Sequence, residues 1–140
     1  MKVQTAHLGP REITEAEIIR FLAPLPPFVG LERFVLVGTA EEEPFLWLQS
    51  VDEAALAFVV APYAEVAGPP PALSGEARAS LGLLPEEAPE VYAILCVGTS
   101  AAETTMNLLA PVYVCRRTQR GQQIVSADDP ARARAPLLAP

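Results

Sequence analysis

The chain has little of what most enzymes and metal sites are built from. Its 140 residues include one histidine, His7, and one lysine, Lys2. A site with two histidine ligands is therefore impossible, and no second histidine can serve as a base if His7 is structural. No serine or cysteine is flanked by the glycines of a nucleophile elbow, and no glycine-rich loop ends in Gly-Lys-Ser or Gly-Lys-Thr. These absences predict a protein that is not an enzyme and holds no metal or cofactor.

Long hydrophobic runs are also missing. The uncharged runs at 91–102 and 104–115 last twelve residues each, whereas a helix that spans a bilayer needs about 20 apolar residues. The first ten residues contain no continuous apolar stretch followed by a small-residue cleavage site, which argues against a cleaved secretion signal. The sequence therefore predicts a cytoplasmic protein that does not enter a membrane.

Cysteine is scarce as well. Cys96 and Cys115 both lie in apolar, strand-like segments. Two cysteines are too few for a disulfide scaffold, and thiols in the cytosol are kept reduced. We therefore expect both residues to be buried, reduced thiols.

Positive charge is in short supply. Nine arginines and one lysine stand against seventeen acids, which gives a formal charge of −7. Residues 1–110 carry a balance of −10 and residues 111–140 a balance of +3. Most of this surface would repel a phosphate backbone, so we expect no direct binding to nucleic acid and favour a basic protein partner.

Short apolar segments separated by turn residues predict a mainly β fold. Ser74 as N-cap and Gly82 as stop predict a short helix ending near Leu81, and four prolines make 61–71 a poor central strand. Pro111 implies an edge strand or a bulge, and residues 25–30 are expected to form a compact turn with Phe28 inward. The expected strands are Val3–Leu8, Ile18–Leu22, Phe34–Val37, Phe45–Leu48, Leu56–Val60, Val91–Val97, Thr105–Cys115 and Gln123–Ser126.

Turn signals about every ten residues favour antiparallel pairing between these strands. We predict a single small antiparallel β-barrel-like domain over residues 1–127, with one or two short helices. Residues 128–140 alternate alanine, arginine and proline, and are expected to form a loosely held tail.

The stretch 44–60, PFLWLQSVDEAALAFVV, contains a polar break between two apolar runs. Ser50 and Asp52 could be part of a hydrolase site, but no base is available to activate the serine. We therefore interpret the stretch as two core strands joined by a polar connection that begins at Gln49 and Ser50.

Two acidic loops are the candidates for a partner-binding surface. One is Glu41, Glu42 and Glu43, and the other is Asp52 with Glu53. Adjacent carboxylates on a strand point to opposite faces, so they suit solvation or a basic partner better than chemistry on one bond. Pro62 and Tyr63 complete the predicted surface.

An ordered series of short motifs resembles the bacterial flagellar assembly factor FliW family. The series spans nearly the whole chain, although the proline-rich segment 61–73 departs from the family pattern. Its members are Leu25-Pro26 with Phe28, Phe34-Val-Leu36, Pro44-Phe45, Leu48-Gln-Ser-Val51, Ala57-Phe-Val-Val60, Leu81-Gly82 ahead of Pro85-Glu86, Thr105-Met-Asn-Leu108, Ala110-Pro111, Thr118-Gln-Arg-Gly-Gln-Gln-Ile124, and Arg134 with Pro136-Leu137.

The resemblance implies a β-barrel-like protein that acts by exchanging partners in the cytoplasm. Proteins of this family bind flagellin and, once released from it, bind the RNA-binding translational repressor CsrA away from its RNA surface. A monomer that binds flagellin and CsrA is therefore the leading hypothesis. The alternative is a β-barrel that binds a small molecule without catalysis, which would require a sizeable apolar cavity with convergent polar groups.

Overall fold

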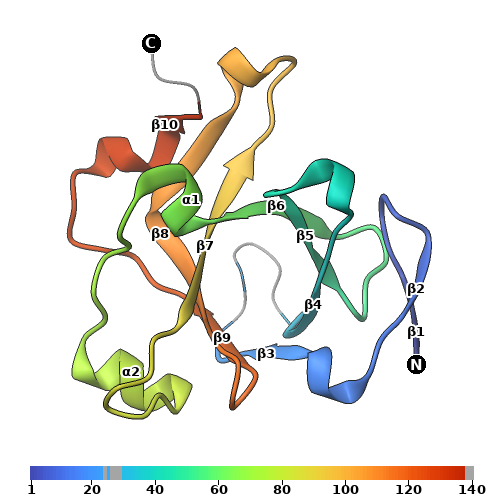
Figure 1. The fold of residues 1–140 in the computed structure, drawn as a ribbon, viewed down its shortest axis with the longest axis horizontal. Coiled ribbons are helices and arrows are strands. Elements are labelled where there is room, and N and C mark those ends of the chain that lie inside the picture. The colour runs from blue at the N-terminus through green and yellow to red at the C-terminus, as the bar shows by residue number, and fades with distance from the viewer. Residues whose placement is uncertain (24, 26–29, 138–140) are drawn as a thin grey trace.

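The computed structural model describes residues 1–23, 25 and 30–137 (Figure 1). Within that part of the chain, seven strands close into a ring in the order β8-β7-β6-β5-β4-β3-β9, with β9 pairing back onto β8. The β3–β9 pair is parallel and the other pairs are antiparallel. The predicted fold class is confirmed. The strands are β3 (Ile19–Phe21), β4 (Arg33–Val37), β5 (Leu46–Ser50), β6 (Ala57–Pro62), β7 (Glu90–Cys96), β8 (Thr105–Cys115) and β9 (Arg120–Gln123).

The remaining elements lie outside this ring or extend it. An N-terminal hairpin packs its apolar residues against the outer side chain of Val35, and β10 pairs with the start of β8. These elements are the strands β1 (Lys2–Gln4), β2 (Pro10–Glu12) and β10 (Ala135–Pro136), the helices α1 (Tyr63–Ala67) and α2 (Gly75–Leu81), and the 3-10 helices η1 (Glu15–Glu17), η2 (Ala40–Glu42), η3 (Ala101–Glu103) and η4 (Pro130–Arg134).

Large side chains from alternate strand positions fill the interior of the barrel. The rings of Phe21 and Phe34 meet edge to face with their centroids 5.3 Å apart. A filled interior counts against the small-molecule-binding alternative. The buried members of this cluster are Ile19, Phe21, Leu25, Phe34, Leu48, Leu56, Val60, Tyr92, Val112 and Val114.

A second apolar cluster lies on the outer face of β6, β7 and β8. Tyr63 from α1 and Leu137 from the C-terminal segment pack against Leu95 and Met106 there. The segment 130–137 is therefore held against the barrel, and the expectation of a loose tail from residue 128 was wrong for these residues. Composition gave no sign of this, because β10 uses an open edge of β8 that only the assembled sheet provides.

Both ends of α2 match the predicted helix. The Ser74 hydroxyl accepts a hydrogen bond from the Ala77 N–H at 3.1 Å, and Gly82 ends the helix in the left-handed conformation with φ +76°. The segment after residue 60 differs from prediction, because β6 continues to Pro62 between β5 and β7 and α1 follows at once. Proline is tolerated here because Pro62 lies beyond Val60, the last β6 residue that pairs with β5, and so has a neighbouring strand on one side only.

Several boundaries and one cysteine also differ from prediction. The first expected strand ends at Gln4, and β9 starts at residue 120 instead of 123. Cys115 is buried as expected, whereas Cys96 is exposed at the end of β7. The register between β7 and β8 shifts opposite the segment that contains Pro111, which confirms the bulge. The predicted turn carrying Phe28 lies outside the described residues.

Candidate partner-binding surface

A row of apolar side chains crosses the outer face of the barrel from strand to strand. Trp47 stands opposite Val37 on one side and Val59 on the other, and Leu95 stands opposite Met106. Since residues directly opposite each other in a sheet share a face, these side chains all point outward. Side chains alternate between the two faces of a strand, so residues next to these in the chain point inward and fill the barrel.

Part of this row is covered and part is open. Residues of α1 and the C-terminal segment cover its β8 end, and an open groove of about 430 Å³ remains over Trp47, Val59 and Leu95. The groove is also lined by the η2 loop and by the connection between β7 and β8, which protrudes from the barrel in Figure 1. Val97, on that hairpin, keeps 61% of its surface exposed. An open apolar groove of this kind is typical of a protein-interaction site.

The first acidic loop forms one rim of the groove. Glu41, Glu42 and Glu43 all line it and all are exposed. Apart from a long contact of 3.4 Å from the Thr39 hydroxyl to the Glu42 carboxylate, these side chains accept no hydrogen bond or ion pair from the residues that the structure describes. Their charge is therefore available to a cationic partner.

The second acidic loop lies at the other end of β5 and is tied into the fold. Arg33 donates to both carboxylate oxygens of Asp52, with an Nε–Oδ2 distance of 3.1 Å. Hydrogen bonding from Arg33 holds the pKa of Asp52 below its ordinary value. The Ser50 hydroxyl accepts from the backbone N–H groups of Asp52 and Glu53 at 3.2 and 3.0 Å. The two predicted acidic loops are thus not brought together.

Gln49 and Ser50 do not begin the polar connection, as the sequence suggested, but end the strand β5. Both are fully buried. The Gln49 amide donates to the carbonyls of Ala54 and Leu56 at 3.1 Å each, and its oxygen accepts from the Ala6 N–H at 2.8 Å. A polar side chain whose nitrogen and oxygen are both hydrogen-bonded, as here, can be buried in place of an apolar one.

The pair Pro62 and Tyr63 fits the predicted surface only in part. Tyr63 is 1% exposed, and its hydroxyl accepts a hydrogen bond from Arg132 at 3.1 Å. It is a core residue, and its assignment to the partner surface was wrong. Pro62 is half-buried and shares a shallow hollow with Glu43, so it lies beside the first acidic loop.

His7 meets the groove in a way that the sequence did not reveal. Its imidazole stacks on the indole of Trp47 with centroids 3.8 Å apart and an interplanar angle of 20°. The two residues are far apart in the chain, and no local pattern connects them. The outward apolar residues of the groove, by contrast, left a signal, since segment 91–97 is apolar at successive positions and must present apolar side chains to both faces.

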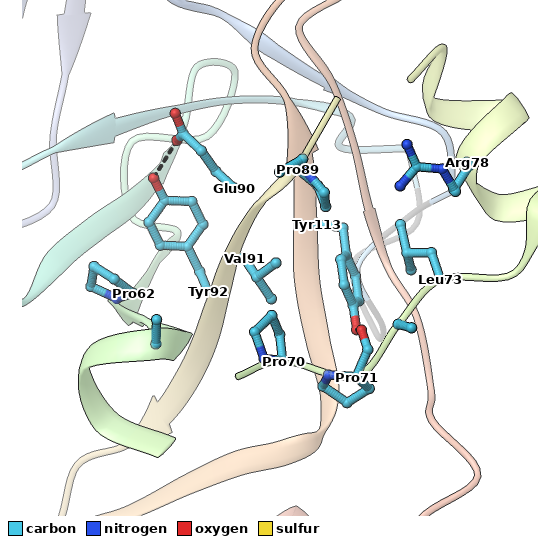
Figure 2. Close-up of a pocket in the computed structure, with 13 residues that line it drawn as sticks. Pro62, Pro70, Pro71, Leu73, Arg78, Pro89, Glu90, Val91, Tyr92 and Tyr113 are labelled. Atoms are coloured by element: carbon cyan, nitrogen blue, oxygen red, sulfur yellow. Dashed lines mark hydrogen bonds between the residues drawn. The ribbon is translucent and has the colours of Figure 1, made fainter. Parts of the chain in front are cut away.

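A second cleft of about 510 Å³ lies beside the proline-rich segment (Figure 2). Pro70 and Pro71 form one wall, and the Tyr113 hydroxyl donates to the Pro71 carbonyl at 3.0 Å. The Tyr92 hydroxyl donates to Glu90 at 2.6 Å. Burial raises the pKa of both tyrosines to about 12, so their hydroxyls remain protonated donors.

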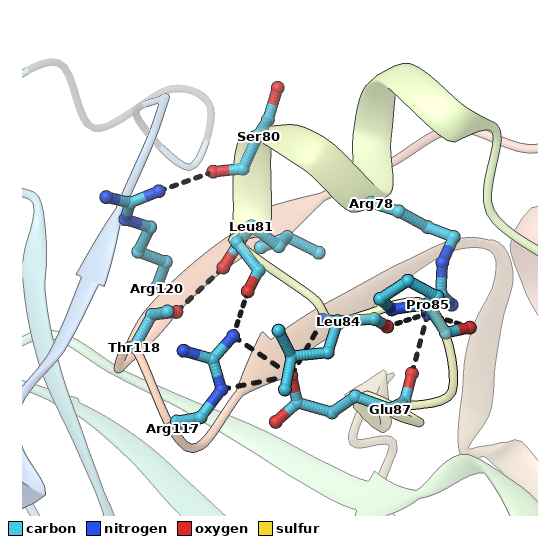
Figure 3. A network of polar contacts seen from close by, with 10 residues as sticks. Arg78, Ser80, Leu81, Leu84, Pro85, Glu87, Arg117, Thr118 and Arg120 are labelled. Carbon is cyan, nitrogen blue, oxygen red and sulfur yellow. Dashed lines mark hydrogen bonds and ion pairs between the residues drawn. The ribbon is translucent and has the colours of Figure 1, made fainter.

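The turn between β8 and β9 closes the C-terminal end of α2 (Figure 3). The Thr118 hydroxyl donates to the Leu81 carbonyl at 2.7 Å, Arg120 donates to the Ser80 carbonyl at 3.2 Å, and Arg117 donates to the Gly82 carbonyl. Cationic donors at the last carbonyls of a helix satisfy groups that have no partner within the helix. This part of the Thr-Gln-Arg-Gly motif is structural.

Metal and membrane features are absent from the described part of the chain. Within it, no three histidine, cysteine, aspartate or glutamate side chains come together as metal ligands. No helix there is long and apolar enough to cross a bilayer.

Comparison with known proteins agrees with the resemblance seen in the motifs. The family model described as FliW protein matches residues 2–137. The chain belongs to the FliW family. It is 37% identical to the flagellar assembly factor FliW of an Exiguobacterium species over 138 residues, covering 98% of this chain and 94% of that one. It is 36% identical to that of Desulfitobacterium hafniense over 126 residues, covering 89% of this chain and 83% of the relative.

A solved structure extends the FliW assignment to three dimensions. The crystal structure of a flagellar assembly factor FliW superposes with a TM-score of 0.90 at 29% identity, covering 100% of this chain and 99% of that one. The match includes the segments outside the ring, such as the C-terminal segment on β8. The departures in the proline-rich segment 61–73 therefore leave the FliW fold unchanged.

Proposed function

We propose that this chain is a cytoplasmic flagellar assembly factor that binds flagellin and, when released from it, binds the translational repressor CsrA. Binding antagonises CsrA allosterically and relieves repression of flagellin translation. The protein acts as a monomer by exchanging partners, without covalent chemistry and without binding nucleic acid itself. Competition between two partners converts the flagellin level into free antagonist by mass action.

The open groove with its acidic rim is the observation that carries this proposal. Its floor of Trp47, Val59 and Leu95 offers apolar area for a partner to bury, which yields about 25 cal/mol per Å² before the costs of association. Its rim of three carboxylates, which form no ion pair with the described residues, favours a basic partner and speeds the encounter. CsrA, as an RNA-binding protein, is expected to carry the overall positive charge that attracts such a rim, whichever of its faces makes the contact.

A charge placed in the groove tests this assignment. Val97→Asp adds a carboxylate beside the apolar floor, and a partner that covers the groove must desolvate it. We expect at least about a tenfold loss of affinity for the partner that uses the groove. Val125→Asp is the matched control, because Val125 is 70% exposed and lies outside the groove. Titration calorimetry with purified flagellin and CsrA gives both affinities, and equal affinities for the two variants would place the interface elsewhere.

Partner exchange itself is tested by gel filtration at low salt. The protein, mixed with the flagellin or the CsrA of its own organism, is expected to form a complex with each, and added flagellin should displace CsrA. Light scattering of each peak should give one copy of this chain per complex. Absence of a complex with either partner would overturn the proposed function.

A further inference from the structure

Three arginines form a row across the outer face of neighbouring strands. Arg20 on β3 stands opposite Arg33 on β4 and opposite Arg120 on β9. The flanking residues Ile19 and Phe21 point into the barrel, so all three guanidinium groups lie outside. In the ring, β3 is three strands away from both β6 and β7. The arginine row therefore lies across the barrel from the groove.

The chain itself balances only part of this charge. Arg33 is neutralised by Asp52. Arg20 reaches Glu15 only at 3.5 Å, with side-chain exposures of 59% and 71%, and such exposed pairs contribute little. One nitrogen of the Arg120 guanidinium donates a hydrogen bond to the Ser80 carbonyl. Its other nitrogens point away from the end of α2 (Figure 3). Two cationic groups thus face solvent side by side.

Like charges directly opposite each other destabilise a sheet. Three of the nine arginines of this acidic chain occupy facing positions here. The cost is offset when an anionic group binds between them. We propose that the arginine row binds an acidic helical segment of a partner protein, with carboxylates meeting Arg20 and Arg120.

Spacing and charge select this kind of ligand. Neighbouring strands lie about 4.8 Å apart, which is close to the separation of about 5–6 Å between side chains four residues apart on a helix. An acidic helix face can therefore place one carboxylate near each guanidinium, where bidentate pairing is strong. A long phosphate backbone would extend beyond the row onto an acidic surface and be repelled.

The test uses a helical peptide with glutamate at every fourth position, a matched peptide with glutamine there, and a single-stranded RNA. Binding to the full chain is followed by NMR titration at low and high salt. We expect saturable binding of the glutamate peptide that weakens with salt and drops at least about tenfold in Arg20→Glu. Arg134→Glu makes the same charge change on an exposed residue of η4 and should bind like the parent chain.

Each other outcome contradicts the proposal. Equal binding of the glutamine peptide would show that carboxylates are not recognised. An equal loss of peptide affinity in Arg134→Glu would show that only the total charge of the protein matters. Tighter binding of the RNA than of the glutamate peptide would show that the ligand is a nucleic acid. Arg20→Gln serves as a second variant, with an expected intermediate loss, should the reversal alter folding. Because the arginine row and the groove are separate, Val97→Asp should leave peptide binding unchanged.

Discussion

Two acidic loops lie at opposite ends of β5, and their sequences alone give no reason to separate them. The carboxylates of the Glu41–Glu43 loop have no cationic partner among the described residues and border an apolar groove. Asp52, by contrast, is held by Arg33, and the backbone of its loop is bound by Ser50 and Gln49. The comparison shows that an acidic cluster becomes a candidate interface only when the fold leaves its charges unpaired beside surface that a partner can bury.

The largest effect is expected where the second loop is anchored. Gln49→Leu removes the amide that bonds the Ala54 carbonyl and the Ala6 N–H and leaves these two groups without that partner, while the Leu56 carbonyl keeps its bond from the Ser50 N–H. We expect unfolding free energy to fall by about 3 kcal/mol, since each such group costs about 1–3 kcal/mol. Urea denaturation followed by circular dichroism measures the change. Gln4→Leu, at an exposed position of β1, is the control and should change stability by less than about 0.5 kcal/mol.

Charge reversal on the first loop should affect binding instead of stability. Glu42→Lys is expected to weaken CsrA binding by about tenfold at low salt and to flatten its dependence on salt, because it removes complementary charge from the rim. Glu53→Lys, in the second loop, should weaken it much less. Surface plasmon resonance at two salt concentrations distinguishes them. Comparable losses in both variants would mean that the two loops act as one surface.

Removal of the Asp52 charge should produce a smaller, pH-dependent loss of stability. The pKa of Asp52 is lowered in the folded state, so its contribution is present above the unfolded value of about 3.9 and disappears as the pH falls through the folded value. Asp52→Asn should cost about 0.5–1 kcal/mol at neutral pH, given the partial exposure of the pair. Denaturation at pH 7 and near pH 3 should show the difference between variant and parent shrinking at the lower pH.

The smallest effect on stability is expected in the first loop. Replacing Glu41, Glu42 and Glu43 together by glutamine removes three exposed carboxylates that make no ion pair with the described residues. The unfolding free energy should therefore stay within about 0.5 kcal/mol of the parent value. Thermal unfolding by calorimetry measures this. A larger loss would reveal that the rim is structural, and would remove the contrast between the two loops.

Local chemistry made much of the fold predictable. The extent of β8 followed from its apolar run, and the ends of α2 followed from Ser74 and Gly82. The Thr14 N–H donates to the Glu17 carboxylate at 3.2 Å beside a single 3-10 turn, and the strand predicted over 18–22 follows it as β3. Such features depend on residues a few positions apart, so the sequence reports them directly.

The candidate site was less predictable because it depends on contacts between distant segments. Composition and motif order were enough to identify an acidic, mainly β member of the FliW family. Net charge is a sum over residues, and a series of motifs is read directly from the order of the chain. Only the tertiary structure decided that Tyr63 is buried and bonded by Arg132, that Asp52 is paired, and that Glu41–Glu43 form no ion pair with any described residue. Pairing and burial depend on which strands become neighbours, and closure of the barrel determines that arrangement.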